Sequence, residues 1–392
     1  MRRVAIVGAA RTPIGKMGGM LSSLSAVELG TIAIQAALHR AQVEPTAVNE
    51  VYMGMAIQAG QGQNPARQAA MHAGLPETVP AMTVNVLCGS GMQAISLAAK
   101  QILLGDAEIM VAGGMESMSN APYILKKGRF GYRFGNSELV DSLSQDGLTD
   151  AFYHYPMGMT AENLLDRYPV SREDLDAFAL QSQERAIKAT ESGRFKDEIV
   201  PVTVKTKKQT VVVDKDEPIR ETSMAALAKL KPVFKEGGDV TAGNSSGIND
   251  GAAAVILMDA EKAEADGYSI LGYWIDGNLV GVDPAIMGIG PLQATNKLMK
   301  KHALQADDLD LVEVNEAFAA QSVVTIRELG LNPKIVNVNG GAIALGHPLG
   351  DSGARIIVTL LYEMQKRQSK LGLASLCIGG GMGAATLIER TK

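Results

Sequence analysis

This chain of 392 residues is poor in cysteine, in aromatic residues and in net charge. Its two cysteines are too few for a disulfide framework, and no C-x-x-C spacing suggests a dithiol redox pair. A formal net charge of -5 gives no general attraction to nucleic acid or to an anionic membrane surface. No apolar run reaches the roughly 18 residues that a membrane span needs, so we expect no nucleic-acid partner and no membrane insertion.

What the chain has in quantity is small and aliphatic residues. Hydrophobic residues make up 46% and glycines number 42, whereas aromatic residues are only 4%, a composition typical of an α/β protein with closely packed helices. The length allows two or three domains. The apolar start of the chain is interrupted at Arg11, Thr12 and Pro13 without a small-residue cleavage site, so we expect no signal peptide and a cytoplasmic location.

Two passages of the sequence repeat. At a shift of 261 positions, LHRAQVEPTAVNEVYMG (38–54) aligns with MKKHALQADDLDLVEVN (299–315), and both read as a helix end followed by a strand. At a shift of 262, CGSGMQAI (88–95) aligns with GDSGARII (350–357). The repeat predicts two similar α/β halves, each built on a mixed, mostly parallel sheet with crossover helices.

A third match, at a shift of 267, aligns VAGGM (111–115) with IGGGM (378–382) and pairs Met110 with Cys377. After this match the first half contains many more residues than the second before its next strand. We therefore predict an insertion, in which Ser171 caps a helix and PVTVKTKKQTVVVDKDEP forms a hairpin. The predicted domains are an N-terminal half (residues 1–119 with 247–268), an inserted loop domain (120–246) and a C-terminal half (269–392).

Three glycine-rich turns carry Cys88, His347 and Cys377. Glycines allow a substrate close to the backbone, and a helix that begins at such a turn lowers a thiol pKa. We expect the three side chains to meet where equivalent strand ends and helix starts come together. The alternatives are that both cysteines pack as small hydrophobes and that His347 is a hydrogen-bonded core histidine.

Five blocks of sequence resemble the thiolase family over the whole chain: NVLCGSGMQAI, TAGNSSGINDGAAA, VEVNEAFAAQ, GGAIALGHPLG and CIGGGMG. The resemblance implies a duplicated thiolase-like fold and an acyltransferase that makes or cleaves a carbon–carbon bond in a 3-ketoacyl-CoA. It also implies acetyl-CoA, 3-ketoacyl-CoA and CoA as ligands, no metal or redox cofactor, a homo-oligomer (dimer or tetramer) and a part in fatty acid metabolism.

By this resemblance Cys88 is the nucleophile and His347 the base that takes its proton. We expect backbone N–H groups of Gly89 and Ser90 to favour the thiolate. Cys377 is similar to the residue that removes a proton from the acetyl methyl, which suits a thiol pKa shifted only modestly from about 8.5.

Two oxyanions form during such a reaction, and each needs donors fixed in advance. The resemblance assigns the first to His347 with a water held by Asn315, and the second to the backbone N–H groups of Cys88 and Gly379. Without the resemblance, Asn315 reads as an N-cap of the helix that follows in EAFAAQ.

The resemblance also implies residues that bind coenzyme A. Arg220 is similar to an adenosine-contacting arginine, and Ser246 to a serine that meets the pantetheine arm. The remaining CoA-binding candidates are apolar: Leu148, Met157, Met287, Phe318 and Ala242. For single methionines the alternative is ordinary packing, and for Arg220 it is a solvated charge.

The sequence departs from short-chain thiolases at Pro156, where those proteins commonly have a histidine. His154 lies two positions earlier and faces the same side only if the segment is extended. Pro156 favours longer acyl chains, whereas GRFGYRFGNSELVDSLSQDGLTDAFY and Arg220 resemble the short-chain biosynthetic type. We expect acetyl transfer, in which two acetyl-CoA give acetoacetyl-CoA and CoA, with a degradative thiolase for longer chains as the alternative.

A second departure is Asp351, where the family usually has a small uncharged residue. A carboxylate in the first turn of a helix stabilises it by about 0.3–1 kcal/mol, and one so near His347 also favours a raised imidazole pKa. We interpret Asp351 as a helix-start residue and expect Asp351→Ala to keep turnover within an order of magnitude.

Two other functions compete with this interpretation. The 3-ketoacyl synthases share the duplicated fold and the nucleophilic cysteine, but Cys377 and NEAF argue against them. A non-catalytic thiolase-like lipid carrier would lack reactive groups, whereas all four catalytic side chains are present here.

Overall fold

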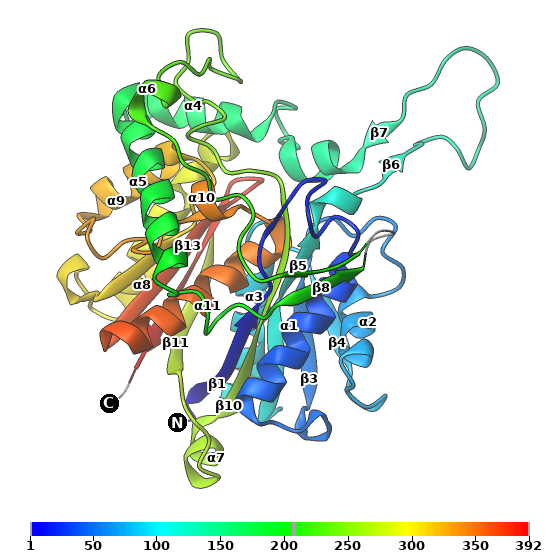
Figure 1. The fold of residues 1–392 in the computed structure, drawn as a ribbon, viewed down its shortest axis with the longest axis vertical. Helices are drawn as coiled ribbons and strands as arrows, with labels where there is room; N and C mark the ends of the chain where they lie inside the picture. The colour runs from blue at the N-terminus through cyan, green and yellow to red at the C-terminus, as the bar shows by residue number, and fades with distance from the viewer. Residues whose placement is uncertain (1, 206–208, 391–392) are drawn as a thin grey trace.

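The computed structural model describes residues 2–205 and 209–390, which form one large mixed sheet with helices on both faces and between its halves (Figure 1). The strands follow one another across the sheet in this order: β12 (Leu311–Val314), β13 (Leu371–Ile378), β14 (Met382–Glu389), β11 (Gly272–Gly281), β1 (Val4–Arg11), β10 (Asn249–Asp259), β5 (Ile109–Ser117), β3 (Glu50–Gly54) and β4 (Ala81–Val84). The short strand β2 (Gly15–Lys16) pairs with β10. Within the described ranges, no helix is both long and apolar enough to cross a membrane.

The strands reveal the duplication. In the first half β3 and β5 are parallel, and β5, β10 and β1 follow in antiparallel pairs. In the second half β12 and β13 are parallel, and β13, β14 and β11 follow in the same way. The α/β class and the two similar halves are confirmed, while the sheet has more antiparallel pairing than the mostly parallel arrangement that we predicted.

The helices form three groups around this sheet. In the first half, α1 (Ala26–Ala41) and α2 (Pro65–His72) pack on the strands, and in the second half α8 (Gly290–Lys301) does so, with α9 (Ala319–Leu329) packed beside it. Between the halves, α3 (Ser90–Leu104) and α11 (Leu349–Arg367) contact each other and strands of both halves. The remaining short helices are η1 (Pro45–Ala47), α7 (Ala260–Ala265), η4 (Pro284–Ile289), η5 (Ala306–Asp308) and α10 (Ala342–Leu345).

The strand register corrects one detail of the repeat. Met110 pairs with Glu50 in the first half, and Gly372 pairs with Leu311, the counterpart of Glu50, in the second. Met110 therefore corresponds to Gly372, and its predicted equivalence to Cys377 is wrong. The glycines of VAGGM lie inside β5, whereas those of IGGGM form the turn between β13 and β14, so the two stretches match in letters only.

The chain between β5 and β10 lies outside the main sheet and holds its own short elements: η2 (Met118–Asn120), β6 (Tyr123–Ile124), β7 (Val140–Asp141), η3 (Leu143–Leu148), α4 (Met157–Arg167), α5 (Arg172–Glu191), β8 (Val202–Lys205), β9 (Thr210–Val213) and α6 (Met224–Leu227). The Ser171 side chain caps α5 by accepting from the Asp174 N–H, and β8 pairs with β9 as the predicted hairpin. The loop from β6 to β7 extends away from the body, and α4 and α6 lie at the end opposite to both termini (Figure 1). The boundaries 120–246 stay a prediction.

A buried ion cluster ties this insertion to the main sheet. The guanidinium of Arg11, at the end of β1, is fully buried and donates to Glu198 (2.7 Å) and to both oxygens of Asp216 (2.7 and 2.9 Å). Asp216 also accepts from the Ile14 N–H, and Glu198 accepts from Thr359 of α11. One arginine thus neutralises two carboxylates that arrive from distant parts of the chain.

We predict that Arg11→Met lowers the free energy of unfolding by about 3–5 kcal/mol, because it leaves two buried carboxylates without their counter-ion. The midpoint of urea unfolding, followed by circular dichroism, measures the change. Arg167→Met is the matched control, since Arg167 pairs with Asp283 at the surface (3.0 Å) and its loss is expected to cost less than about 1 kcal/mol. Equal shifts in the two variants would contradict the prediction.

Candidate active site

A single cavity of about 520 Å³ collects most of the predicted site residues. It opens between the insertion and the two halves, and its wall is mainly apolar. The predicted catalytic residues that line it are Cys88, His347 and Gly379, and the predicted CoA-binding residues that line it are Arg220, Ser246, Leu148, Met157, Met287, Phe318 and Ala242. Cys377 and Asn315 are not part of this lining, and their positions are described below.

Cys88 lies in the turn between β4 and α3. The preceding residue, Leu87, has a positive φ of 47°, a conformation that non-glycine residues rarely adopt and that marks a strained turn. A Cβ atom at Gly89 would overlap the side chain of Ile378, so the two cysteine-bearing turns pack directly against each other. This close approach explains why a glycine follows the predicted nucleophile.

The surroundings of Cys88 differ from the prediction. Burial raises the pKa of its thiol to about 11, and Glu116 adds to the rise, while the backbone N–H groups of Gly379 and Cys88 itself oppose it. The N–H groups of Gly89 and Ser90 donate to the carbonyls of Val86 and Leu87 within the turn, so they do not stabilise a thiolate as we expected. The resting residue is a thiol and needs a base.

His347 is placed to be that base. Its backbone N–H donates to Asn249 Oδ1 (2.9 Å), which anchors the turn that begins at Gly346, where φ is +111°. Its Nδ1 lies 2.6 Å from Ser352 Oγ, and the Ser352 hydroxyl donates to the carbonyl of Pro348 (2.8 Å). Ser352 therefore accepts from Nδ1–H, which assigns the lone pair to Nε2.

The Nε2 atom is available for proton transfer. It is buried, and no described residue is within hydrogen-bonding distance of it. Burial lowers the pKa of His347 to about 3, and the positive charge of Arg355 adds to the lowering. The imidazole is neutral near pH 7, because burial and Arg355 outweigh the rise of its pKa that we expected from Asp351.

Asn315 follows β12 directly. It does not cap a helix as its alternative reading required, since α9 begins at Ala319 with Phe318 as its N-cap residue. Its Nδ2 lies 3.4 Å from His347 Nδ1, and its Oδ1 is buried with no partner in the described part of the chain. The amide thus lies beside the imidazole, while its role in an oxyanion hole stays a prediction.

Cys377 is the penultimate residue of β13 and lies behind the cavity wall. Its side chain is 0% exposed and packs with Met287 and Ala317, while Met157 and Phe318 cover the same cluster. Burial raises the pKa of this thiol far above its ordinary value, and the charge of Cys88 adds to the rise, so the modest shift that we expected is wrong. The electrostatic influence of Cys88 places the two sulfur atoms near each other.

Two methionines therefore separate Cys377 from the cavity. Methionine side chains are unbranched and change rotamer easily. Cys88, in contrast, is part of the cavity lining.

The residues that hold the site were missed by sequence reasoning. Glu116 accepts from the N–H groups of Ala56 (2.9 Å), Ile57 (3.2 Å) and Gly350 (2.9 Å) and so fixes the start of α11 to the end of β3. The other missed residues are Glu316, Ser352 and Asn249. Asn249 lies in the INDG part and Glu316 in the NEAF part of the sequence blocks given above, so the sequence motifs could have indicated both residues. No motif of the sequence indicates Glu116.

The structure also shows where the residues that bear on acyl-chain length are located. Pro156 lines the cavity, whereas His154 is exposed with a positive φ of 59° and is outside the lining. The segment is a turn and is not extended, so His154 does not replace the histidine of short-chain thiolases. Arg220 lines the cavity, and its backbone N–H donates to Gln183 Oε1 (3.0 Å).

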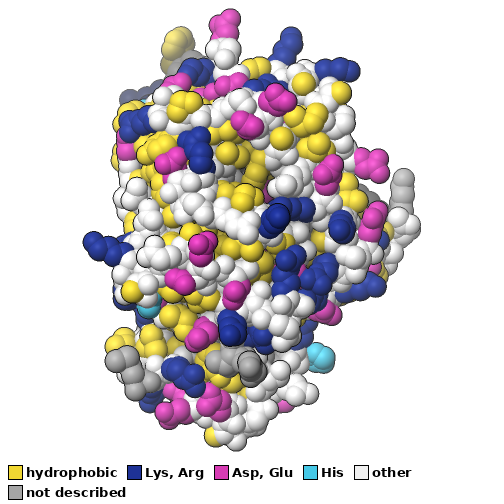
Figure 2. All heavy atoms as spheres, turned by 90° about the vertical axis from the view of Figure 1, so that its left-hand side faces the viewer, with side chains coloured by type: hydrophobic (Ala, Val, Ile, Leu, Met, Phe, Trp, Pro, Cys, Tyr) yellow, Lys and Arg dark blue, Asp and Glu magenta, His cyan; other side chains and the backbone are white. Residues whose placement is uncertain are grey.

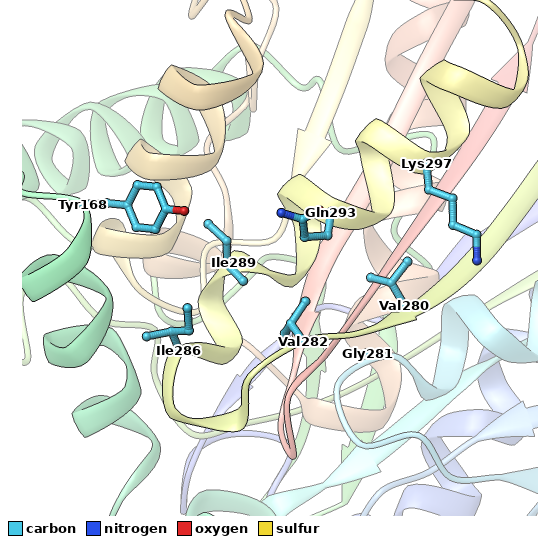
Figure 3. Close-up of a pocket in the computed structure, with 8 residues that line it drawn as sticks. All are labelled: Tyr168, Val280, Gly281, Val282, Ile286, Ile289, Gln293 and Lys297. Carbon is cyan, nitrogen blue, oxygen red and sulfur yellow. The ribbon is translucent and has the colours of Figure 1, made fainter.

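The described residues form a second hollow of different character. It lies beside α8, is lined by Tyr168, Ile286, Ile289, Gln293 and neighbouring residues, and has no thiol or imidazole in its lining (Figure 3). The face of the molecule seen in Figure 2 carries both basic and acidic side chains, with apolar side chains exposed between them. In the ranges that the structure describes, no group of three or more His, Cys, Asp or Glu side chains is placed to hold a metal ion.

Comparisons with known proteins agree with this geometry. Residues 4–261 match the family described as "Thiolase, N-terminal domain" and residues 268–390 match "Thiolase, C-terminal domain". The chain is 54% identical to an acetyl-CoA acetyltransferase of Syntrophomonas wolfei, with 99% of both chains covered, and 56% identical to one of Chromobacterium violaceum, again with 99% of both covered.

Solved structures are equally similar. The crystal structure of the Bacillus anthracis acetyl-CoA acetyltransferase superposes with a TM-score of 0.97 at 47% identity, covering 99% of both chains. That of human mitochondrial 3-ketoacyl-CoA thiolase also gives 0.97, at 45% identity, covering 100% of this chain and 99% of the other. The predicted resemblance is confirmed: the chain belongs to the thiolase family.

Proposed function

We propose that this protein is an acetyl-CoA C-acetyltransferase, which joins two acetyl-CoA into acetoacetyl-CoA and CoA and catalyses the reverse thiolysis. The observation that carries the proposal is that one cavity is lined by a thiol, Cys88, and by a neutral imidazole, His347, whose unpartnered Nε2 carries the lone pair. The names of the relatives support the acetyl group as the transferred unit. Acyl transfer of this kind uses a thiolate nucleophile and a general base.

The first half-reaction moves one proton and one acetyl group. His347 Nε2 takes the proton of Cys88, and the thiolate attacks the thioester carbonyl of acetyl-CoA. The carbonyl oxygen becomes negative and is stabilised by donors such as the N–H of Gly379, which already favours a charged Cys88. CoA leaves as a thiolate and takes the proton from His347.

The second half-reaction forms the carbon–carbon bond. The Cys377 thiol first gives its proton to His347 Nε2, and the resulting thiolate removes a proton from the methyl group of a second acetyl-CoA. The carbanion attacks the acetyl thioester on Cys88. The Cys88 thiolate leaves and takes the proton back from His347, and acetoacetyl-CoA is released. A high thiol pKa makes Cys377 a stronger base once it is deprotonated, which suits the weakly acidic methyl group.

The remaining parts of the proposal concern ligands and setting. Arg220 and the apolar wall of the cavity suit the charged and pantetheine parts of coenzyme A, the wall including Leu148 and Phe318. The two proton transfers use side chains of the site, so the mechanism requires no metal or redox cofactor. A homo-oligomeric state and a part in fatty acid metabolism follow from the family resemblance, and a cytoplasmic location is a further part of the proposal.

A degradative thiolase for longer 3-ketoacyl chains is the second candidate. One observation favours it: Pro156 lines the cavity where short-chain thiolases commonly have a histidine, and His154 does not replace it.

We predict that Cys88→Ser abolishes acetoacetyl-CoA thiolysis and prevents the mass increase of one acetyl group after incubation with acetyl-CoA. Cys377→Ser is expected to keep this acetylation while thiolysis falls by at least about a hundredfold, because it removes only the base for the carbon acid. Intact-protein mass spectrometry and a coupled absorbance assay measure the two effects. Substrate binding by the wild type without any acetylation would instead identify a lipid carrier.

We predict that kcat/KM for thiolysis is highest with acetoacetyl-CoA and declines along a 3-ketoacyl-CoA series up to sixteen carbons. The reason is that Met157, Met287 and Phe318 pack over Cys377 and leave little room beyond a short acyl group. Met157→Ala is expected to raise the rate with longer chains relative to acetoacetyl-CoA. A wild-type preference for long chains would favour the degradative candidate.

A further inference from the structure

Three buried ionisable side chains behind His347 take no part in the mechanism above. Asp351 and Arg355 lie one turn apart on α11, each 1% exposed, and Glu313 lies in β12 and is 0% exposed. Helix α11 packs on β12, so the three side chains belong to one region, which we call the polar cluster.

The polar cluster is notable for its missing hydrogen bonds. Both oxygens of Asp351, both oxygens of Glu313 and all three guanidinium nitrogens of Arg355 are buried without a hydrogen-bond partner among the described residues. The closest contact, from Arg355 Nη1 to Glu313 Oε2, is 3.7 Å and too long for a direct hydrogen bond. Buried polar atoms are rarely left unpaired, and bound water is the usual partner at such sites.

The polar cluster is adjacent to the catalytic imidazole. If Gly251 carried a Cβ atom, that atom would lie 3.1 Å from Asp351 Oδ2 and also 3.1 Å from the Pro348 ring. The Asp351 carboxyl therefore lies beside Pro348, the residue that directly follows His347. The charge of Arg355 reaches His347 itself, where it opposes protonation of the imidazole. A negative charge on Asp351 counteracts the effect of the positive charge of Arg355 on His347.

Charged groups from several elements face the polar cluster. Burial raises the pKa of Asp351 to about 8, and its charged neighbours are Arg355, Arg11, Glu116 and Asp216. Burial also raises the pKa of Glu313 to about 8, and its charged neighbours are Arg355, Glu198, Glu316 and Glu363. In both cases Arg355 favours the ionised carboxylate.

We propose that bound water joins Asp351, Arg355 and Glu313 into one hydrated cluster, and that Asp351 is a positioning residue whose carboxylate stabilises the imidazolium of His347 while Cys88 forms its thiolate. The only covalent change is the transfer of one proton from Cys88 Sγ to His347 Nε2. This transfer creates a positive charge near Arg355, and the negative charge of Asp351 offsets the repulsion. The inference rests on the proposed roles of Cys88 and His347.

The test measures the rate at which iodoacetamide alkylates Cys88 in the full-length protein, followed by mass spectrometry of the Cys88 peptide. Wild type is compared with Asp351→Ala and with Asp351→Asn between about pH 6 and about pH 9. Glu313 ionises in every variant, but only the wild type gains a carboxylate at position 351 as the pH rises through about 8. The ratio of wild-type to variant rate is therefore expected to be near one at low pH and to rise to as much as about tenfold at high pH, a plausible size for one nearby charge.

A purely structural role for Asp351 predicts a different result. Local disorder would change the ratio by the same factor at every pH, and a ratio of one throughout would mean that the carboxyl has no influence on His347. Either result overturns the inference. Ala is small and uncharged, as the family's residue at this position usually is, and Asn keeps the shape of Asp. Thermal unfolding shows which of the two variants is folded and enters the comparison.

The matched control is Asp276→Asn, which removes a mostly buried carboxyl that contacts Lys301 and His302 away from the cavity. Its rate ratio is expected to stay near one at every pH, and a ratio that rises as in the Asp351 variants would overturn the inference. Thiolysis of acetoacetyl-CoA by the wild type is measured separately. Failure of thiolysis with a rising alkylation ratio would reject the proposed function and leave the role of Asp351 in place.

Discussion

Exclusion of water from the reacting side chains is the constraint on which the rest of this structure depends. Burial is the largest cause of the pKa shifts of Cys88, Cys377 and His347, and in all three it favours the neutral form. Both sulfur atoms therefore rest as thiols and the imidazole as a free base. The site needs fixed dipoles and charges to support the ion pair that appears only during the reaction, and the N–H of Gly379, which favours the charged form of Cys88, is one of them.

The duplication explains how turns can form a site from which water is excluded. The central helices α3 and α11 begin next to Cys88 and His347 respectively, and both are covered by strands of the two halves. A turn at the start of either helix is consequently enclosed by the other half, although turns usually lie on the surface. The contact between Gly89 and Ile378 is one result, since it brings the turn of the first half against the turn of the second.

The sequence was sufficient for the fold and for most of the cavity because each turn carries its own signal. Glycines around Cys88, His347 and Cys377 mark close backbone approaches, and the repeat places the turns of Cys88 and His347 at equivalent helix starts. The electrostatics were not predictable in the same way. We expected the N–H groups of Gly89 and Ser90 to stabilise the Cys88 thiolate, but they form hydrogen bonds within the turn instead. Whether an N–H group is used in this way depends on backbone angles, which the sequence pattern does not specify.

Burial depth was the other property that the sequence did not reveal. Asp351 reads as a helix-start residue, and it does lie in the first turn of α11, but its carboxyl is buried between the halves and makes no hydrogen bond to the described part of the helix. Cys377 likewise reads as a reactive turn cysteine, yet it lies behind Met157 and Met287. Both errors have one cause, because a local motif defines the turn while the opposite half determines what covers it.

The position of Cys377 gives the two thiols different tasks. Cys88 contacts the cavity and has a neutral base nearby, so it can lose its proton before any rearrangement. Cys377 has no imidazole partner of its own and lies under flexible side chains, and a charge on Cys88 makes its ionisation harder. Acetylation of Cys88 removes that charge by converting the thiolate into a neutral thioester. The electrostatic coupling of the two sulfur atoms therefore favours the order in which acyl transfer comes first and removal of the carbon-bound proton follows.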